Sequence, residues 1–206
     1  MALSIVTLNA NGIRDQSKRA GLLQWFRSFT AVPDIVCLQE CHCSSDLECQ
    51  ASFRASGYLC ALAAGSTHAR GCIILFRPNL SLIQSRSESD CRFWLCEFRF
   101  CNQVFRVCCV YAPSNPARNQ FLVSVSIGPS VPTVLAGDSN TVLNRSLDRR
   151  GSDPFDVSRE SSCAMNRLLN ACSSIDIWRY LHPTSSSYTW TRSDGPHLPL
   201  KLPILL

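Results

Sequence analysis

Several short apolar runs of the sequence end in polar side chains that could act together on one substrate. They are Asn9 after "SIVTL", Glu40 after "DIVCLQ", Tyr111 after "VCCV", and Asp138 with Asn140 after "TVLAG". Short apolar runs predict buried β-strands, and a rigid strand leaves the residue at its tip in a fixed, accessible place. Carboxylates, amides and a phenol at strand ends therefore indicate a site for acid–base or metal-assisted chemistry.

The residue types in this set fit the hydrolysis of a phosphodiester. Glu40 offers the hard oxygen ligand that Mg²⁺ prefers, and Mn²⁺ accepts the same ligand. Asp138 is suited to orienting or deprotonating an attacking water. The amides of Asn9 and Asn140 could donate to phosphate oxygens, and so could the hydroxyl of Tyr111. We therefore predict a hydrolase site with one metal ion, one acid for the water and neutral donors for the phosphate.

Each of these residues also has a purely structural interpretation. Asn9 could cap a strand end, Glu40 could pair with an arginine, and Tyr111 could belong to the core. Asp138 and Asn140 are common turn residues and could form a plain Asx turn. Only the coincidence of the whole set favours the functional interpretation.

The elements that would position this set are mostly strands. We predict strands over residues 4–9, 34–40, 71–78, 93–100, 104–113, 133–138 and 187–192, with 93–100 and 104–113 forming a hairpin. We predict helices over 18–29, where apolar residues recur at helical spacing, and over the first part of 161–178. Hairpin strands mixed with crossover helices favour a mixed sheet with helices outside, or two stacked sheets between helix layers.

The length and charge of the chain limit the kinds of partner that it can have. The chain has 206 residues, which suffices for one sizeable core. Its formal net charge is +5, and its basic residues are Arg except for Lys18 and Lys201. A mildly positive, Arg-rich chain is compatible with DNA or another anionic partner. No apolar run is long enough to span a membrane, so we expect no membrane partner, and we expect a monomer.

The cysteines are numerous, at 13. No signal peptide is visible, so we expect an intracellular protein, nuclear or cytoplasmic and not secreted, with reduced thiols. The sequence lacks the two CxxC motifs that a structural zinc site commonly uses, so we expect no such site. Five cysteines lie inside apolar strand-like runs and are predicted to be buried small hydrophobes, namely Cys37, Cys72, Cys96, Cys108 and Cys109.

Six stretches occur in the order and rough spacing of a known family. They are "TLNANGIR", "DIVCLQE", "GCIILF", "VCCVYAPSN", "VLAGDSNTVLN" and "LDR". Together they resemble the endonuclease/exonuclease/phosphatase family. "DIWRYLHPTSSSYTWTRSDG" narrows the resemblance to the apurinic-type endonuclease domain of LINE-like, non-LTR retrotransposons. The resemblance covers about residues 4–195, so we expect one domain over 1–195 and an unrelated Pro/Leu-rich tail over 196–206.

The resemblance implies a four-layer α/β sandwich that nicks DNA with Mg²⁺ and leaves a 3′-hydroxyl for a reverse transcriptase to extend. It assigns Asn9 and Glu40 to the metal site and Tyr111 to phosphate contact. Asp138 and Asn140 match the Asp and Asn of the family's "GDFN", with Ser139 in place of the aromatic residue. It places four residues at the DNA, namely Asn11, Ser114, Arg149 and Thr189.

The sequence departs from the family pattern after "YTW". The family continues with "S-x-I-D" and then "S-D-H", whose His engages the scissile phosphate, and neither motif follows here. The four histidines are His42, His68, His182 and His197, and none stands in such a context. The tail "PHLPLKLPILL" suggests a frameshift, an altered splice or a truncated gene copy, with the last strands missing. We therefore expect low or absent activity. An inactive DNA-binding remnant and a phosphatase of the same fold stay open as alternatives.

Overall fold

The computed structural model describes residues 3–43, 47–63, 70–88, 90–128, 131–148 and 159–186. The chain divides into two compact units, Met1–Tyr111 and Ala112–Leu206. Each unit is described by itself below. Over the described ranges, no helix is both long and apolar enough to cross a membrane.

The first sheet of the first unit contains four strands in the order β1-β2-β4-β3. They are β1 (Ile5–Asn9), β2 (Ile35–Gln39), β3 (Leu59–Ala63) and β4 (Cys72–Phe76). β1 and β2 run parallel, whereas β4 is antiparallel to both β2 and β3. Every residue of β2 and β4 is buried, which explains why these strands read as continuous apolar runs.

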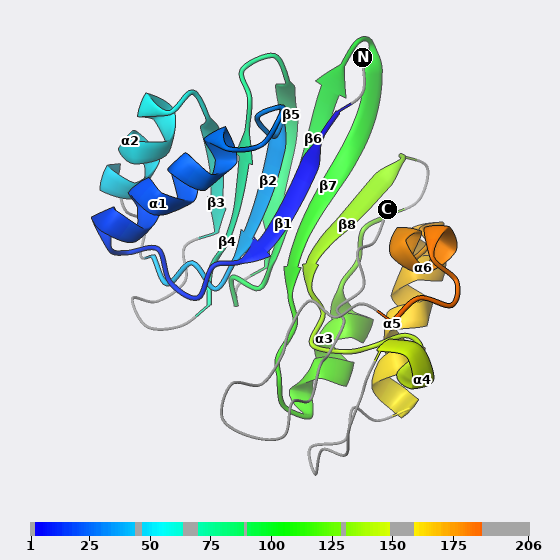
Figure 1. Ribbon diagram of the computed structural model, residues 1–206. Coiled ribbons are helices and arrows are strands. Elements are labelled where there is room, and N and C mark those ends of the chain that lie inside the picture. Colours follow the sequence, from blue (N-terminus) through cyan, green and yellow to red (C-terminus); the bar gives the residue numbers. More distant parts are fainter. Residues whose placement is uncertain are drawn as a thin grey trace. The chain divides into compact units, whose positions relative to one another are not determined.

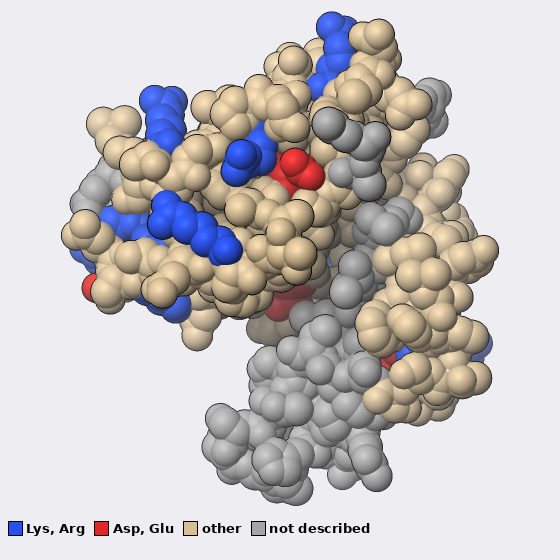
Figure 2. Space-filling view, turned by 45° about the horizontal axis from the view of Figure 1, so that its top comes forward, with Lys and Arg blue, Asp and Glu red and all other residues tan. Residues whose placement is uncertain are grey.

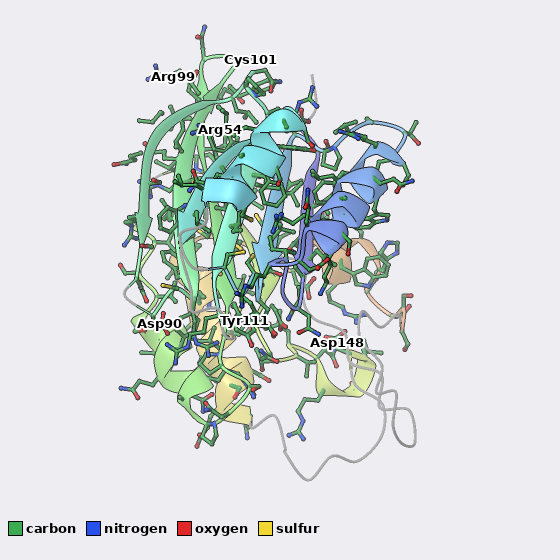
Figure 3. All side chains as sticks on the ribbon, turned by 90° about the vertical axis from the view of Figure 1, so that its left-hand side faces the viewer. Arg54, Asp90, Arg99, Cys101, Tyr111 and Asp148 are labelled. Atoms are coloured by element: carbon green, nitrogen blue, oxygen red, sulfur yellow. The ribbon has the colours of Figure 1, made fainter. Side chains whose placement is uncertain are left out.

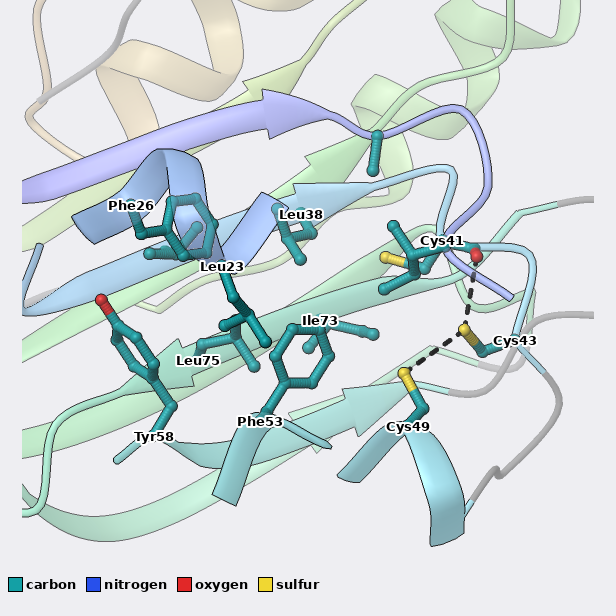
Figure 4. Packing of buried hydrophobic residues seen from close by; sticks show 13 residues of the cluster. Leu23, Phe26, Leu38, Cys41, Cys43, Cys49, Phe53, Tyr58, Ile73 and Leu75 are labelled. Atoms are coloured by element: carbon teal, nitrogen blue, oxygen red, sulfur yellow. Dashed lines mark hydrogen bonds between the residues drawn. The ribbon is translucent and has the colours of Figure 1, made fainter. Parts of the chain in front are cut away.

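Helices α1 (Gln16–Arg27) and α2 (Leu47–Ala55) cover one face of this sheet (Figure 1). The side chain of Asp15 caps α1 by accepting a hydrogen bond from N of Lys18 at 3.0 Å. Leu23 and Phe26 of α1 and Phe53 of α2 pack with residues of β2 and β4 in one buried cluster (Figure 4). This cluster anchors the two helices on the sheet.

The first unit also contains an antiparallel set of three strands, β5 (Ser81–Ser87), β6 (Phe93–Phe100) and β7 (Gln103–Tyr111). Cys101 and Asn102 form the β6–β7 turn with φ values of 48° and 63°, which suits a tight hairpin. The ring of Phe98 lies 5.0 Å from the ring of Phe76 in β4, so the two sheets stack face to face. Tyr111 lies at the end of the hairpin opposite Cys101 (Figure 3).

The second unit contains α3 (Ala117–Ser124), β8 (Thr133–Asp138), α4 (Arg145–Asp148), α5 (Arg159–Ala171) and α6 (Ile177–Leu181). α3 packs against α5, and Nη1 of the buried Arg118 contacts Oγ of Ser161 at 3.4 Å across that interface. Asp176 caps α6 by accepting from N of Arg179 at 3.0 Å.

Most predicted elements are confirmed. The strands expected over 4–9, 34–40, 71–78, 93–100, 104–113 and 133–138 correspond to β1, β2, β4, β6, β7 and β8, and the two expected helices correspond to α1 and α5. The prediction missed α2, α3, β3 and β5 and the short helices α4 and α6. β5 is exposed along its whole length and α2 alternates polar with apolar residues, so neither gives a clear pattern. The strand expected over 187–192 lies outside the described residues.

The thirteen cysteines are free thiols. The five that were predicted to be buried are confirmed as buried, namely Cys37, Cys72, Cys96, Cys108 and Cys109. Burial raises the pKa of Cys96 to about 12 and so keeps this thiol protonated at neutral pH. These thiols fill core volume rather than act as nucleophiles.

Candidate active site

The parallel pairing of β1 with β2 brings two predicted residues together. The register sets Asn9 opposite Gln39, so the end of β1 lies beside the residue that precedes Glu40. Nδ2 of Asn9 donates to Oε1 of Glu40 at 2.9 Å. The side chains of the two predicted residues are therefore in direct contact.

The "NANG" segment after β1 holds this pair in place. N of Asn11 donates to Oδ1 of Asn9 at 3.1 Å, and N of Gly12 donates to O of Glu40 at 2.6 Å. Asn11 and Gly12 have φ values of 43° and 83°, a left-handed turn in which glycine is favoured. A Cβ at Gly12 would also lie 3.1 Å from Nδ1 of His42. Asn11 is exposed beside the pair, as its predicted DNA contact requires.

Tyr111 joins the pair from the end of β7, on the other sheet of the first unit. Its hydroxyl donates to Glu40. Burial, and then the hydrogen bond to Glu40 and the charge of that carboxylate, raise the pKa of Tyr111 to about 12, against an opposing effect of Arg92. The phenol is therefore a protonated donor at neutral pH. Its acceptor is the carboxylate of Glu40.

Arg92 contacts Tyr111 and was not predicted from the sequence. Its guanidinium carbon lies 4.7 Å from the centroid of the Tyr111 ring, and its Nη1 donates to O of Tyr111 at 3.3 Å. Asp90 pairs with Nε of Arg92 at 3.5 Å. Arg92 thus contacts both the ring and the main chain of Tyr111. Asp90 and Tyr111 lie at the same end of the hairpin (Figure 3).

His42 is a second neighbour of Glu40 that the sequence did not identify. Its Nε2 lies 3.7 Å from Oε2 of Glu40. Glu40 and His42 both have positive φ values, at 51° and 53°, so the segment after β2 is tightly turned. Residues two apart in such a turn can face one another, which periodicity alone does not reveal.

In the second unit, Asp138 and Asn140 form a compact turn after β8. Oδ1 of Asp138 accepts from N of Asn140 at 2.9 Å, so the Asx-turn hydrogen bond is present. Nδ2 of Asn140 donates to O of Ala112 at 2.8 Å, and N of Ala112 donates to O of Asp138 at 2.8 Å. Asn140 has a φ of 47°. Asp138 is buried, which favours a specific role over a solvated turn acid.

Arg118 supports the segment that faces this turn. Its Nε donates to O of Pro113 at 3.1 Å, and its Nη2 donates to O of Ser114 at 2.8 Å. Burial lowers the pKa of Arg118, and the nearby charge of Asp138 opposes that shift. Ser114 itself is exposed, which is compatible with its predicted DNA contact.

The "DIWRYLHP" stretch has a clear structural basis. Nη2 of Arg179 donates to Oδ1 of Asp148, and Nη1 donates to O of His182 at 2.9 Å. The rings of Trp178 and His182 lie 4.2 Å apart. This motif therefore joins α6 and the segment after it to α4. His182 caps α6 and has a structural role.

The predicted site residues thus fall into two groups. Asn9, Glu40 and Tyr111 lie together in the first unit, and Asp138 and Asn140 lie together in the second. Arg149 and Thr189 lie outside the described residues. Within the described ranges, no group of three or more His, Cys, Asp or Glu side chains is arranged to hold a metal ion.

A model of the endonuclease/exonuclease/phosphatase family matches residues 6–199. The chain belongs to this family. A relative is the transposon TX1 uncharacterized 149 kDa protein of Xenopus laevis, which is 26% identical over 96% of this chain. The chain spans only 15% of that relative's length.

Solved structures of low sequence identity share the fold. An AP endonuclease from Archaeoglobus fulgidus superposes with a TM-score of 0.75 at 18% identity, over 99% of this chain and 86% of that one. A variant of the 3′ phosphatase NExo from Neisseria, bound to a product DNA hairpin, superposes with a TM-score of 0.69 at 19% identity. The match again covers 99% of this chain and 86% of that one. The predicted α/β sandwich of two stacked sheets flanked by helices is thereby confirmed.

Proposed function

We propose that the chain is a Mg²⁺-dependent DNA endonuclease domain of retrotransposon origin that hydrolyses a phosphodiester and leaves a 3′-hydroxyl nick. The observation that carries this proposal is the contact between Asn9 and Glu40, with Tyr111 bonded to the same carboxylate. Family membership, the transposon relative and the DNA in the Neisseria structure support it.

The donor set at Glu40 fits a hard divalent cation. Members of this family generally depend on a divalent metal. Glu40 offers carboxylate oxygens and Asn9 an amide oxygen, and Mg²⁺ commonly takes one or two carboxylates while it keeps several waters. Bound there, the ion would neutralise phosphate charge and polarise the scissile bond. Mn²⁺ suits the same oxygen ligands.

The remaining residues have distinct tasks in this proposal. Asp138 accepts the proton of the attacking water, and Asn140 donates to a phosphate oxygen. Asn140 is held at a fixed angle by its bond to O of Ala112, which limits the entropy lost on substrate binding. Tyr111 exchanges its bond to Glu40 for one to the phosphate. Arg92 keeps the Tyr111 ring in place during that exchange.

The charge of the first unit suits an anionic polymer. Its exposed basic side chains include Arg14, Lys18, Arg27, Arg54, Arg86 and Arg99. Figure 2 shows Lys and Arg side chains spread over one face, with few acidic side chains between them. Such residues release counterions from DNA, so we expect binding to weaken steeply as salt increases.

Nicking of supercoiled plasmid tests the proposal. The purified chain should convert plasmid to the open-circle form with Mg²⁺, and EDTA should stop the reaction. Asp138→Asn should reduce nicking strongly at any Mg²⁺ concentration, and Glu40→Gln should reduce it at limiting Mg²⁺. Glu160→Gln, a matched change at an exposed acid of α5, should retain it. A DNA polymerase should extend the nicks directly, since it requires a 3′-hydroxyl. Equal nicking by all four proteins would refute the assignment.

A second part of the proposal concerns rate. Residues 196–206 do not carry the family's "S-D-H", so we propose that the 206-residue chain nicks slowly. A rate equal to that of an intact family member would contradict this part alone. Salt-sensitive DNA binding without nicking would instead identify a binding remnant, and release of inorganic phosphate from 3′-phosphate ends without nicking would identify a phosphatase.

A further inference from the structure

Two buried thiols lie beside each other near the segment that carries Glu40. Sγ of Cys43 is 3.7 Å from Sγ of Cys49, and Sγ of Cys43 also donates to O of Cys41 at 3.3 Å (Figure 4). Cys43 and Cys49 are only 2% and 1% exposed. Cys43 follows Glu40 by three residues and Cys49 lies in the first turn of α2, so the pair joins a loop to a helix.

The two sulfurs are in van der Waals contact and are not bonded. A disulfide needs about 2.05 Å between its sulfurs, so the pair must approach by roughly 1.7 Å. Rotation of the side chain of Cys43 from O of Cys41 toward Cys49 supplies part of that distance. Because Cys43 lies in a loop, the main chain can supply the rest without loss of a strand ladder.

Other cysteines of this unit are less able to move. Cys37 and Cys72 both share hydrogen bonds with Cys109, but these three residues lie on β2, β4 and β7 and are held by sheet ladders. Cys41 is held on both sides, since its N donates to O of Gly71 at 3.1 Å and its O accepts from N of Ile13 at 2.9 Å. Among these buried thiols, disulfide formation should therefore select Cys43 and Cys49.

We propose that Cys43 and Cys49 are an oxidation site that forms a reversible disulfide with a small peroxide. One thiolate attacks a peroxide oxygen and becomes a sulfenic acid, and the released hydroxide leaves as water. The second thiol then attacks the sulfenic sulfur and expels a second water. Two thiols are oxidised and one peroxide is reduced to two waters. A dithiol reverses the reaction by exchange and is itself oxidised.

The burial of the pair sets the class of oxidant. Thiols that are 2% and 1% exposed are open to hydrogen peroxide during brief local fluctuations but are too enclosed for glutathione disulfide. The bond would tie the segment of Glu40 to α2. The proposal is independent of the nuclease assignment, because it concerns only these two sulfurs.

Peptide mapping tests the proposal on the full chain. After treatment with hydrogen peroxide, free thiols are blocked with N-ethylmaleimide under denaturing conditions, and the chain is cut after Arg and after Glu. Cys41 and Cys43 then lie in fragment 41–48, Cys49 in 49–54 and Cys37 in 28–40. We expect fragments 41–48 and 49–54 to be joined, and dithiothreitol to separate them. The Cys41→Ala variant should keep this link, whereas Cys43→Ala and Cys49→Ala should lose it.

The exposed Cys101 and Cys163 provide the internal reference for oxidant dose. Absence of the link in the wild type at a dose that oxidises both would overturn the proposal, as would a link that depends on Cys41 instead of Cys43. Thermal unfolding gives a second readout on a Cys101→Ser, Cys163→Ser background. In this double variant, oxidation should raise Tm by about 5 °C. An equal rise in the triple variant that also carries Cys49→Ala would overturn the proposal.

Discussion

The two units hold their candidate residues in different ways. In the first unit, side chains bond chiefly to one another: Nδ2 of Asn9 donates to Glu40 at 2.9 Å, and the hydroxyl of Tyr111 donates to the same carboxylate. Oδ1 of Asn9 also accepts from the main-chain N of Asn11, at 3.1 Å. In the second unit, side chains bond to the main chain, since Asn140 donates to a carbonyl oxygen and Asp138 accepts from an amide N–H. The first group can change with little effect on the backbone, whereas the second group shapes the turn it occupies.

Because of this difference, substitutions in the first unit should change activity with little effect on stability. Substitutions in the second unit should change both. A side-chain network at strand ends rests on strands that are held by their own ladders. A turn with a residue at a φ of 47° rests on the side chains that fix it. Substitutions that keep the hydrogen bonds but remove a charge are therefore the most informative.

The largest effect is expected for Asp138→Asn. The new amide oxygen can still accept from N of Asn140, so the turn is retained, but the general base is lost. Nicking should fall by about 10²- to 10⁴-fold. Initial rates on supercoiled plasmid and a thermal melt of the same preparation measure the two properties. A variant that nicks at the wild-type rate would remove Asp138 from the mechanism.

A smaller effect, dependent on metal concentration, is expected for Glu40→Gln. The glutamine keeps an oxygen for Asn9 but lacks the charge that attracts Mg²⁺. The Mg²⁺ concentration for half-maximal nicking should rise by about 10-fold, an order of magnitude for the loss of one charged ligand, and excess Mg²⁺ should restore much of the rate. Titrations with Glu160→Gln serve as the control. An unchanged Mg²⁺ midpoint with a reduced rate would place Glu40 outside the metal site.

The sequence predicted the residues at the strand ends better than the contacts that these residues make. The apolar runs before Asn9, Glu40 and Asp138 are local signals, and each is confirmed as a strand. The contacts of Arg92 with Tyr111 join positions 19 apart in the chain, and no local pattern marks them. Family resemblance, not periodicity, paired Asn9 with Glu40, because the parallel register of their strands is a tertiary property.

A difference in stability should separate Asn140→Ala from Asn9→Ala. Asn140→Ala loses the bond to O of Ala112 and puts alanine at a left-handed φ, so it should cost about 1–2 kcal/mol of unfolding free energy. Asn9→Ala loses the bonds to Glu40 and to N of Asn11 but leaves the β1 ladder intact, so it should cost less than half of that. Urea unfolding measures both. Equal losses would show that Asn9 and Asn140 support their backbone segments to the same extent.

The smallest effect is a dependence of stability on alkaline pH. Because the pKa of Tyr111 is about 12 in the folded chain and near 10 in an unfolded one, folding favours the protonated phenol. Its contribution is complete below pH 10 and is lost as pH rises toward 12. Urea unfolding at pH 9 and pH 11 should therefore show a larger loss for the wild type than for Tyr111→Phe. Arg92→Gln should leave the loss between pH 9 and pH 11 nearly unchanged, because the folded phenol is already protonated over that range. An equal loss in the wild type and in Tyr111→Phe would show that folding does not raise the pKa of Tyr111.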